Sequence, residues 1–240
     1  MTDVLITDID GTLLQSEKVV VDLNMLQAYR VSNLFVLCTG RNYETFGSFV
    51  KENSFFDFDF AILSNGAMLI DKEFNVLYST TIEIEVLKKQ INQLVCIKGI
   101  VRLFLIINLK EIVFENVTVL LEFVDDLEQS DTLIGLTIEF ITNDYAEECV
   151  NQTQGKSLLS IQHNHNYLDI VSDNITKKSG IMTLLSDLDV RKIKVIGDGE
   201  NDIPMFDMTE YSYTFYDAPM VVRKKANFLV ESYNDIFEMG

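Results

Sequence analysis

The sequence predicts an α/β protein with a doubly wound parallel core sheet and an inserted α+β module. Short apolar runs at Val4–Thr7, Asn33–Cys38 and Phe60–Leu63 alternate with helical patterns at Asp22–Ser32 and Tyr43–Asn53. Strand and helix in this order give parallel strands with helices on both faces. The middle of the chain changes to strands with helices between them, and the alternating pattern then returns.

Each of these strands is a β-branched and apolar run bounded by Gly, Asp or Asn, which is typical of strands buried on both faces. A turn-rich stretch at Asp71–Asn75 predicts a hairpin loop. Beyond it, the expected elements of the middle region are helices at Glu83–Val95, Val119–Glu128 and Asp144–Gln152 and strands at Val101–Asn108, Ile112–Glu115, Leu136–Ile141, Leu158–Gln162 and Tyr167–Val171.

After the middle region, a helix at Ser179–Leu188 and strands at Ile193–Ile196 and Tyr213–Tyr216 restore the first pattern. We therefore assign residues 1–80 and 167–240 to the core domain and residues 81–166 to the insert.

Composition narrows the possible partners. The 240 residues are 48% hydrophobic and carry a formal net charge of -18, with 37 acidic and 19 basic residues. A chain so acidic repels polyphosphate, so nucleic acid is not an expected partner. A small anionic substrate would need local positive charge from a metal or from a few Lys and Arg side chains.

The three cysteines, Cys38, Cys96 and Cys149, are odd in number and lack metal-ligand spacing. Neither a disulfide framework nor a zinc site is expected, and a reducing cytoplasm fits this usage best. No basic segment precedes the first apolar run, and no apolar stretch is long enough for a membrane span, so neither a signal peptide nor a membrane partner is predicted.

Two carboxylates, Asp8 and Asp10, follow the first strand and precede Gly11-Thr12. Residues two apart at a strand end can address one site. Two carboxyl groups so close favour either a bound cation or one protonated partner, and both arrangements suit phosphoryl transfer. A solvated turn remains the alternative for this motif taken alone.

Two further strands also end in polar residues. Asp198, Asn201 and Asp202 lie on a glycine-bearing loop after Ile193–Ile196 and offer the oxygen ligands that Mg²⁺ accepts. Thr39-Gly40-Arg41 supplies a hydroxyl and backbone amides where a helix begins, an arrangement that binds phosphate oxygens. In open α/β sheets ligands bind at the carboxyl ends of the strands, so the three segments predict one pocket.

Four segments in this order resemble the motifs of the haloacid dehalogenase superfamily of aspartate-nucleophile phosphatases. They are Asp8-Ile9-Asp10-Gly11-Thr12-Leu13, Thr39-Gly40-Arg41, a later lysine, and Gly197-Asp198-Gly199-Glu200-Asn201-Asp202. Asn65-Gly66-Ala67 and the large insertion before the lysine are similar to its Cof-type sugar-phosphatase branch, class IIB with a C2-type cap. The resemblance implies a Rossmann-like core and a substrate-specificity cap, and it covers the whole chain.

The resemblance also implies roles for individual residues. Asp8 would be the nucleophile that forms an aspartyl-phosphate, and Asp10 would protonate the leaving alcohol and then activate water. Mg²⁺ would be held by Asp8, the Asp10 backbone carbonyl and Asp198, with Asp202 as a further ligand or as a partner of the ligands. Phosphoryl oxygens would be bound by Thr39, Gly40, Asn201 and a lysine.

The identity of that lysine is open between Lys177 and Lys178. Lys177 follows Thr176, as in the family pattern, whereas Lys178 occupies the usual glycine position. Arg41 could hold a substrate anion, an acidic residue of the insert or only solvent. His163 and His165 would share one side of a predicted strand, where a substrate role is the alternative to a surface position.

Three functions are compatible with these residues. The first is a Mg²⁺-dependent hydrolysis of phosphomonoesters of a small metabolite, sugar phosphates foremost, by a monomer or small homo-oligomer. The second is a phosphotransferase similar to phosphomannomutase, and the third is a catalytically silent binding protein. The complete set of motif residues argues against the third.

Overall fold

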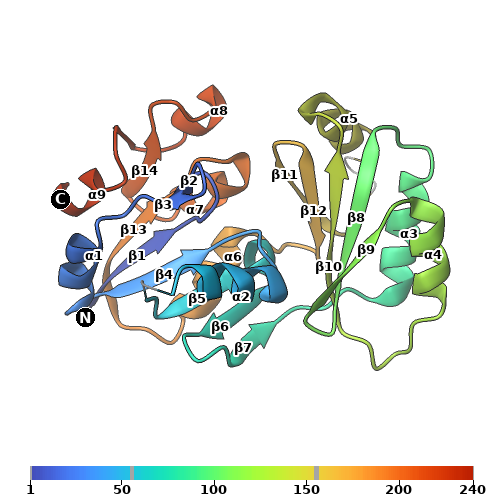
Figure 1. Ribbon diagram of the computed structural model, residues 1–240, viewed down its shortest axis with the longest axis horizontal. Coiled ribbons are helices and arrows are strands. Elements are labelled where there is room, and N and C mark those ends of the chain that lie inside the picture. Colours follow the sequence, from blue (N-terminus) through green and yellow to red (C-terminus); the bar gives the residue numbers. More distant parts are fainter. Residues whose placement is uncertain (1, 55–56, 154–156, 240) are drawn as a thin grey trace.

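The computed structural model describes residues 2–54, 57–153 and 157–239, which form two main sheets lying next to each other (Figure 1). The larger sheet has eight strands in the order β15-β14-β13-β1-β4-β5-β6-β7. The six strands from β15 to β5 are parallel, and β6 and β7 continue the sheet as an antiparallel hairpin. The strands are β1 (Thr2–Thr7), β4 (Leu34–Cys38), β5 (Phe60–Leu63), β6 (Met68–Asp71), β7 (Val76–Ser79), β13 (Val190–Ile196), β14 (Tyr211–Phe215) and β15 (Phe228–Val230).

Both faces of this sheet are buried under helices. Leu5 of β1 packs into one hydrophobic cluster, and its neighbours Val4 and Ile6 pack into another on the opposite face. The first cluster includes residues of α1 (Leu23–Arg30), α2 (Tyr43–Glu52) and α9 (Asp235–Glu238). The second includes residues of α6 (Lys177–Leu185), α7 (Ile203–Phe206) and α8 (Met220–Arg223). The predicted doubly wound α/β class is therefore confirmed.

The smaller sheet is antiparallel throughout, in the order β11-β12-β10-β8-β9. Its strands are β8 (Ile100–Ile107), β9 (Lys110–Phe114), β10 (Leu133–Phe140), β11 (Ser160–Asn164) and β12 (Tyr167–Val171). Helices α3 (Ile84–Leu94) and α4 (Val117–Asp125) cover the face turned away from the larger sheet, and α5 (Asn143–Thr153) packs near one end (Figure 1). We call this sheet with its three helices the cap module.

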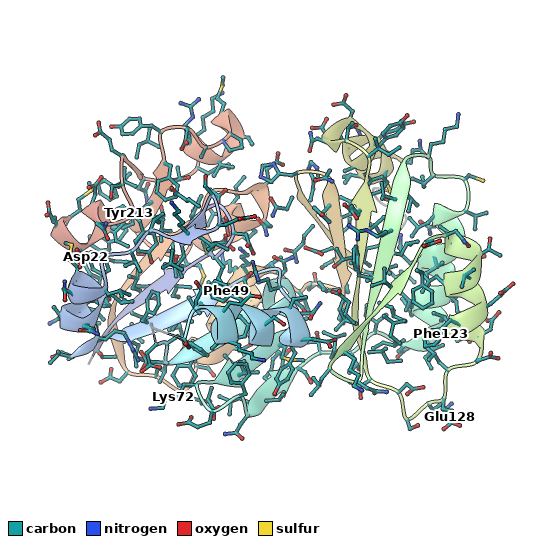
Figure 2. All side chains as sticks on the ribbon, viewed as in Figure 1. Asp22, Phe49, Lys72, Phe123, Glu128 and Tyr213 are labelled. Atoms are coloured by element: carbon teal, nitrogen blue, oxygen red, sulfur yellow. The ribbon has the colours of Figure 1, made fainter. Side chains whose placement is uncertain are left out.

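Each half has its own hydrophobic core. In Figure 2, Phe49 and Tyr213 lie among the side chains around the larger sheet, and both are buried. Phe123 lies in the cap module, where it packs beside the ring of Phe114. No helix of the described residues is both long and apolar enough to cross a bilayer.

The cap module extends beyond residue 166, the end that the sequence suggested. β12 pairs with β10 and β11, so Tyr167–Val171 belongs to the five-stranded sheet and not to the core domain. The error has a physical cause, because an alternating strand pattern shows which residues are buried but not which sheet the strand joins.

Short elements also escaped prediction. A hairpin of two-residue strands, β2 (Leu14–Gln15) and β3 (Lys18–Val19), follows the first motif directly. Helix α6 begins at Lys177 instead of Ser179, because Thr176 caps it and its side chain accepts from the Ser179 backbone N–H. His165 does not continue β11, since it lies at the following turn with a φ of 53°.

Candidate active site

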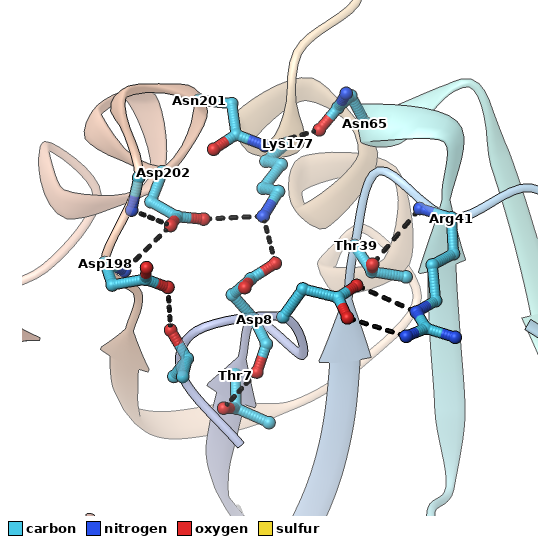
Figure 3. Close-up of polar contacts among 12 residues, drawn as sticks. Thr7, Asp8, Thr39, Arg41, Asn65, Lys177, Asp198, Asn201 and Asp202 are labelled. Carbon is cyan, nitrogen blue, oxygen red and sulfur yellow. Dashed lines mark hydrogen bonds and ion pairs between the residues drawn. The ribbon is translucent and has the colours of Figure 1, made fainter. Parts of the chain in front are cut away.

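The predicted motif residues meet at the carboxyl ends of three neighbouring parallel strands. Asp8 follows β1, Thr39 follows β4, and Asp198 lies two residues beyond the end of β13. Because β1 lies between β4 and β13 in the sheet, Asp8 is at the centre of the group (Figure 3). The expectation that three segments distant in sequence form one pocket is confirmed.

Asp8 and Lys177 form the buried centre of the site. The Lys177 Nζ lies 2.5 Å from Asp8 Oδ1 and 2.6 Å from Asp202 Oδ1, and the lysine has no exposed surface. Burial opposes the charge on Lys177, but the carboxylates of Asp202 and Asp8 outweigh it and raise the pKa of the ammonium group. The two carboxylates therefore favour the charged form of Lys177 beside Asp8, whereas no such contact involves Lys178 among the described residues.

Asp202 organises the loop that carries Asp198. Its Oδ2 accepts hydrogen bonds from the backbone N–H groups of Asp198 at 3.0 Å and Gly199 at 2.9 Å. Its other oxygen accepts from Lys177, so both oxygens of this carboxylate are engaged. Asp202 thus holds both the loop and the lysine in place.

Asp198 is held by the first motif. Thr12 Oγ1 donates to Asp198 Oδ1 at 2.6 Å, which joins two loops 186 residues apart in sequence. Gly11 has a φ of 85°, and a Cβ there would lie 2.2 Å from Asp198 Oδ2, so only glycine permits this close approach. Burial raises the pKa of Asp198 to about 6.

Three carboxylates could together hold a metal ion. Oxygen atoms of Asp8, Asp198 and Asp202 all lie within 4.8 Å of one another. Hard carboxylate oxygens are the donors that Mg²⁺ prefers, so the donor set fits this ion. Burial also raises the pKa of Asp8, and a bound cation would offset this penalty on its charged form.

The Asp10 side chain does not join this group. Arg41 donates to it through Nε at 2.8 Å and through Nη2 at 2.6 Å, a bidentate pair at the mouth of the site. The Arg41 guanidinium also lies 5.0 Å from the centre of the Phe49 ring. Among the described residues, Arg41 therefore pairs with Asp10 of the first motif, and no acidic residue of the cap module contacts it.

The remaining predicted phosphate ligands lie around Asn65. Thr39 is buried, and its Oγ1 accepts from the Arg41 backbone N–H at 3.1 Å. A Cβ on Gly40 would lie 3.3 Å from Asn65 Nδ2. Asn201 Nδ2 donates to Asn65 Oδ1 at 3.0 Å, which brings Asn201 to the same part of the site.

Asn65 is a connecting residue that sequence reasoning noted without assigning a role. It is fully buried in a turn with a φ of 53°, a conformation that asparagine tolerates better than most residues. Its Nδ2 donates to Asp169 Oδ2 at 2.7 Å, while Thr137 donates to the other Asp169 oxygen at 2.6 Å. Asp169 and Thr137 belong to the cap module, so this chain of hydrogen bonds joins the cap to the catalytic loops.

A cavity of about 660 Å³ lies between the core sheet and the cap module and contains the site. Asp8, Asp10 and Asp198 line its core side. The cap side is lined by Phe104, Glu111, Thr137, Asn164, His165, Asn166, Tyr167 and Asp169. Asp8, whose carboxylate contacts the buried Lys177, therefore faces a space large enough for a small metabolite.

Comparison with known proteins agrees with this arrangement. The family model of haloacid dehalogenase-like hydrolases matches residues 5–236. The chain therefore belongs to this family of hydrolases, and the family expected from the motifs is confirmed. No curated protein is significantly similar to the chain in sequence.

Solved structures share the fold at low sequence identity. A subclass IIB sugar phosphatase of the same superfamily is 20% identical with a TM-score of 0.74, over 97% of this chain and 94% of the other. The phosphatase BT1666 from Bacteroides thetaiotaomicron is 22% identical with a TM-score of 0.76, over 99% and 92% of the two chains. The protein SMU.1108c from Streptococcus mutans is 21% identical with a TM-score of 0.77, over 98% and 96%.

Proposed function

We propose that the protein is a Mg²⁺-dependent phosphatase that hydrolyses the phosphomonoester of a small metabolite, a sugar phosphate foremost, through an aspartyl-phosphate intermediate. The observation that carries the proposal is the position of Asp8. Its carboxylate lies at the end of the central strand, beside the Lys177 ammonium and within reach of Asp198. Family membership and the sugar phosphatase among the structural neighbours support the same reaction.

In the first step, an Asp8 oxygen attacks phosphorus and the bond from phosphorus to the leaving alcohol breaks. Lys177 is a buried cation beside Asp8, and it would stabilise negative charge on phosphoryl oxygens bound next to that carboxylate. Thr39, Gly40 and Asn201 would supply further hydrogen-bond donors to the phosphoryl oxygens. Asp8, Asp198, Asp202 and the Asp10 backbone carbonyl would hold Mg²⁺, which would supply positive charge next to the phosphate.

Asp10 serves as the acid and base. It gives a proton to the leaving oxygen in the first step and takes one from water in the second, when water hydrolyses the aspartyl-phosphate. Arg41 pairs with the carboxylate form of Asp10, which is the base of the second step. For the first step, Asp10 would take up a proton from solvent and release Arg41 before it protonates the leaving oxygen. The cap module would exclude stray water during both steps.

A cytoplasmic protein acting as a monomer or small homo-oligomer remains our expectation. Its cysteines agree with a reducing compartment, because Cys38, Cys96 and Cys149 are all free.

The test is hydrolysis of p-nitrophenyl phosphate with and without Mg²⁺, followed by a screen of phosphorylated metabolites with released phosphate as the readout. We expect Mg²⁺-dependent turnover, and a loss of at least about 10³-fold in Asp8→Asn. Asp187→Asn is the matched control, since Asp187 is exposed between α6 and β13, away from the site. It should retain full activity and the same circular dichroism spectrum.

Full activity in Asp8→Asn would contradict the proposal. The same screen separates the other two functions considered from the sequence. A phosphotransferase would need a bisphosphate activator and would isomerise a phosphosugar, and a silent binding protein would release no phosphate from any ester.

A further inference from the structure

The cavity above the proposed nucleophile is strongly acidic. Among the described lining residues, five carry carboxyl groups and two carry basic side chains. The acidic residues are Asp8, Asp10, Glu111, Asp169 and Asp198, and the basic ones are Arg41 and His165. Asp8, Asp10 and Asp198 have proposed roles in catalysis or metal binding. Glu111 and Asp169, the two carboxylates of the cap module, have no such role, so their presence in the cavity needs a separate explanation.

The register of the cap sheet places these two carboxylates on the face toward the core. Asp169 is opposite Thr137, and Thr137 is opposite Phe104, which also lines the cavity. Glu111 is opposite Ile106, which packs into the hydrophobic cluster of the larger sheet. Because opposite residues in a sheet share a face, Glu111 and Asp169 both point toward the core side.

Glu111 is fixed in position by helix α2 of the core. Its Oε2 accepts from Asn42 Nδ2 at 2.5 Å, and its backbone N–H donates to Glu44 Oε2 at 2.9 Å. Asn42 is itself fixed as the N-cap of α2, where its Oδ1 accepts from the backbone of Glu44 and Thr45. No described group donates to Glu111 Oε1, which leaves this oxygen available to a ligand in the cavity.

Neither basic residue of the lining compensates Glu111. Arg41 is held by Asp10 through two hydrogen bonds. His165 forms no ion pair with Glu111 among the described groups. The charge of Arg102 acts on Glu111, but the Arg102 side chain is paired with Glu139 at 2.6 Å and does not line the cavity.

We propose that Glu111 is a specificity-determining residue that excludes leaving groups with a second anionic group and accepts a neutral, hydroxyl-bearing alcohol. The inference rests on the proposed phosphatase activity. A sugar hydroxyl can donate to Glu111 Oε1, whereas a second phosphate or a carboxylate meets the negative charge of this carboxylate in a partly buried space. Burial raises the pKa of Glu111, so the repulsion is complete only at a pH above that raised pKa. The neighbouring side chains of Asn42, Thr45 and Thr137 offer neutral polar contacts to such an alcohol.

The experiment compares kcat/KM for glucose monophosphate, fructose bisphosphate and phosphogluconate in the intact protein, with p-nitrophenyl phosphate as a reference. Glu111→Gln removes the charge but keeps an oxygen that can accept from Asn42. We expect this change to raise the ratio of bisphosphate to monophosphate kcat/KM by about tenfold, and Glu111→Lys to raise it further.

Glu122→Gln is the matched control, because it removes the same charge from an exposed position on α4, on the opposite face of the cap sheet. Its ratio should remain within about twofold of the unmodified protein. Equal kcat/KM for the neutral and anionic sugar esters in the unmodified protein overturns this inference alone. The same holds if Glu111→Gln changes the ratio no more than Glu122→Gln does. If no ester is hydrolysed, p-nitrophenyl phosphate included, the proposed function fails and this inference fails with it.

Discussion

The two sides of the cavity treat buried carboxylates in different ways. On the core side, the carboxylates of Asp8 and Asp202 both form ion pairs with the ammonium group of Lys177. On the cap side, Asp169 accepts from the neutral donors Asn65 and Thr137, and no described cation forms an ion pair with it. The difference supports the proposal that the core side binds a metal ion and the phosphoryl group, whereas the cap side binds neutral polar groups.

The largest expected effect comes from removing the cation on the core side. Lys177→Met leaves the buried carboxylates of Asp8 and Asp202 without their partner, which should lower the free energy of unfolding by about 3–5 kcal/mol. Urea unfolding followed by circular dichroism measures this change.

Lys178→Met is the matched control, because this neighbouring lysine is only partly buried and lacks the two carboxylate contacts. Its effect should stay within about 0.5 kcal/mol. Equal destabilisation by Lys177→Met and Lys178→Met would show that the ion pairs of Lys177 with Asp8 and Asp202 do not stabilise the core side.

A smaller effect is expected where the two sides meet. Asn65→Ala removes the hydrogen bonds to Asp169 and Asn201 and leaves a buried oxygen of Asp169 unpaired, at a cost of about 1–3 kcal/mol. Since Asn65 has a positive φ, part of the loss could come from the backbone. Asn65→Gly separates the two causes, because glycine adopts this conformation without strain.

Unfolding of both variants is again the measurement. A loss in Asn65→Ala that disappears in Asn65→Gly would mean that the backbone matters and that the link between core and cap contributes no stability.

The smallest effects come from two threonines with the same chemistry on opposite sides. Thr12 donates to Asp198 on the core side, and Thr137 donates to Asp169 on the cap side. Replacing either by valine should lower the free energy of unfolding by about 1 kcal/mol. Only Thr12→Val should raise the Mg²⁺ concentration needed for half-maximal turnover, because Asp198 is a proposed ligand. A similar rise in this Mg²⁺ concentration in Thr137→Val would show that metal binding does not depend on the core side alone.

The core side was the more predictable of the two from sequence. A short apolar run that ends in Asp or Thr-Gly marks the end of a buried strand, and parallel strands bring those ends together whatever the distance along the chain. Asp8, Thr39 and Asp198 were placed correctly for this reason. Lys177 was favoured by its position after Thr176, which is also the residue that caps α6.

The contacts of the cap side could not be read in the same way. Asp169 lies 104 residues from Asn65, and Glu111 lies 69 residues from Asn42, so each pair depends on how the two modules dock.

The pairing of Asp10 with Arg41 was also missed, because its geometry depends on side-chain conformations that residue types alone do not fix. The strands β2 and β3 have two residues each, too few for any periodic signal.

The aspartyl-phosphate on Asp8 is tested most directly by trapping it in the Asp10→Asn variant. That variant should lose the base that activates water, so phosphate should remain on the enzyme after the first step. Mass spectrometry of the protein quenched during turnover of p-nitrophenyl phosphate should find one added phosphoryl group, on the peptide that contains Asp8. Phosphate on another residue, or undiminished hydrolysis with no phosphorylated protein, would contradict the assignment of Asp8 as nucleophile and Asp10 as acid and base.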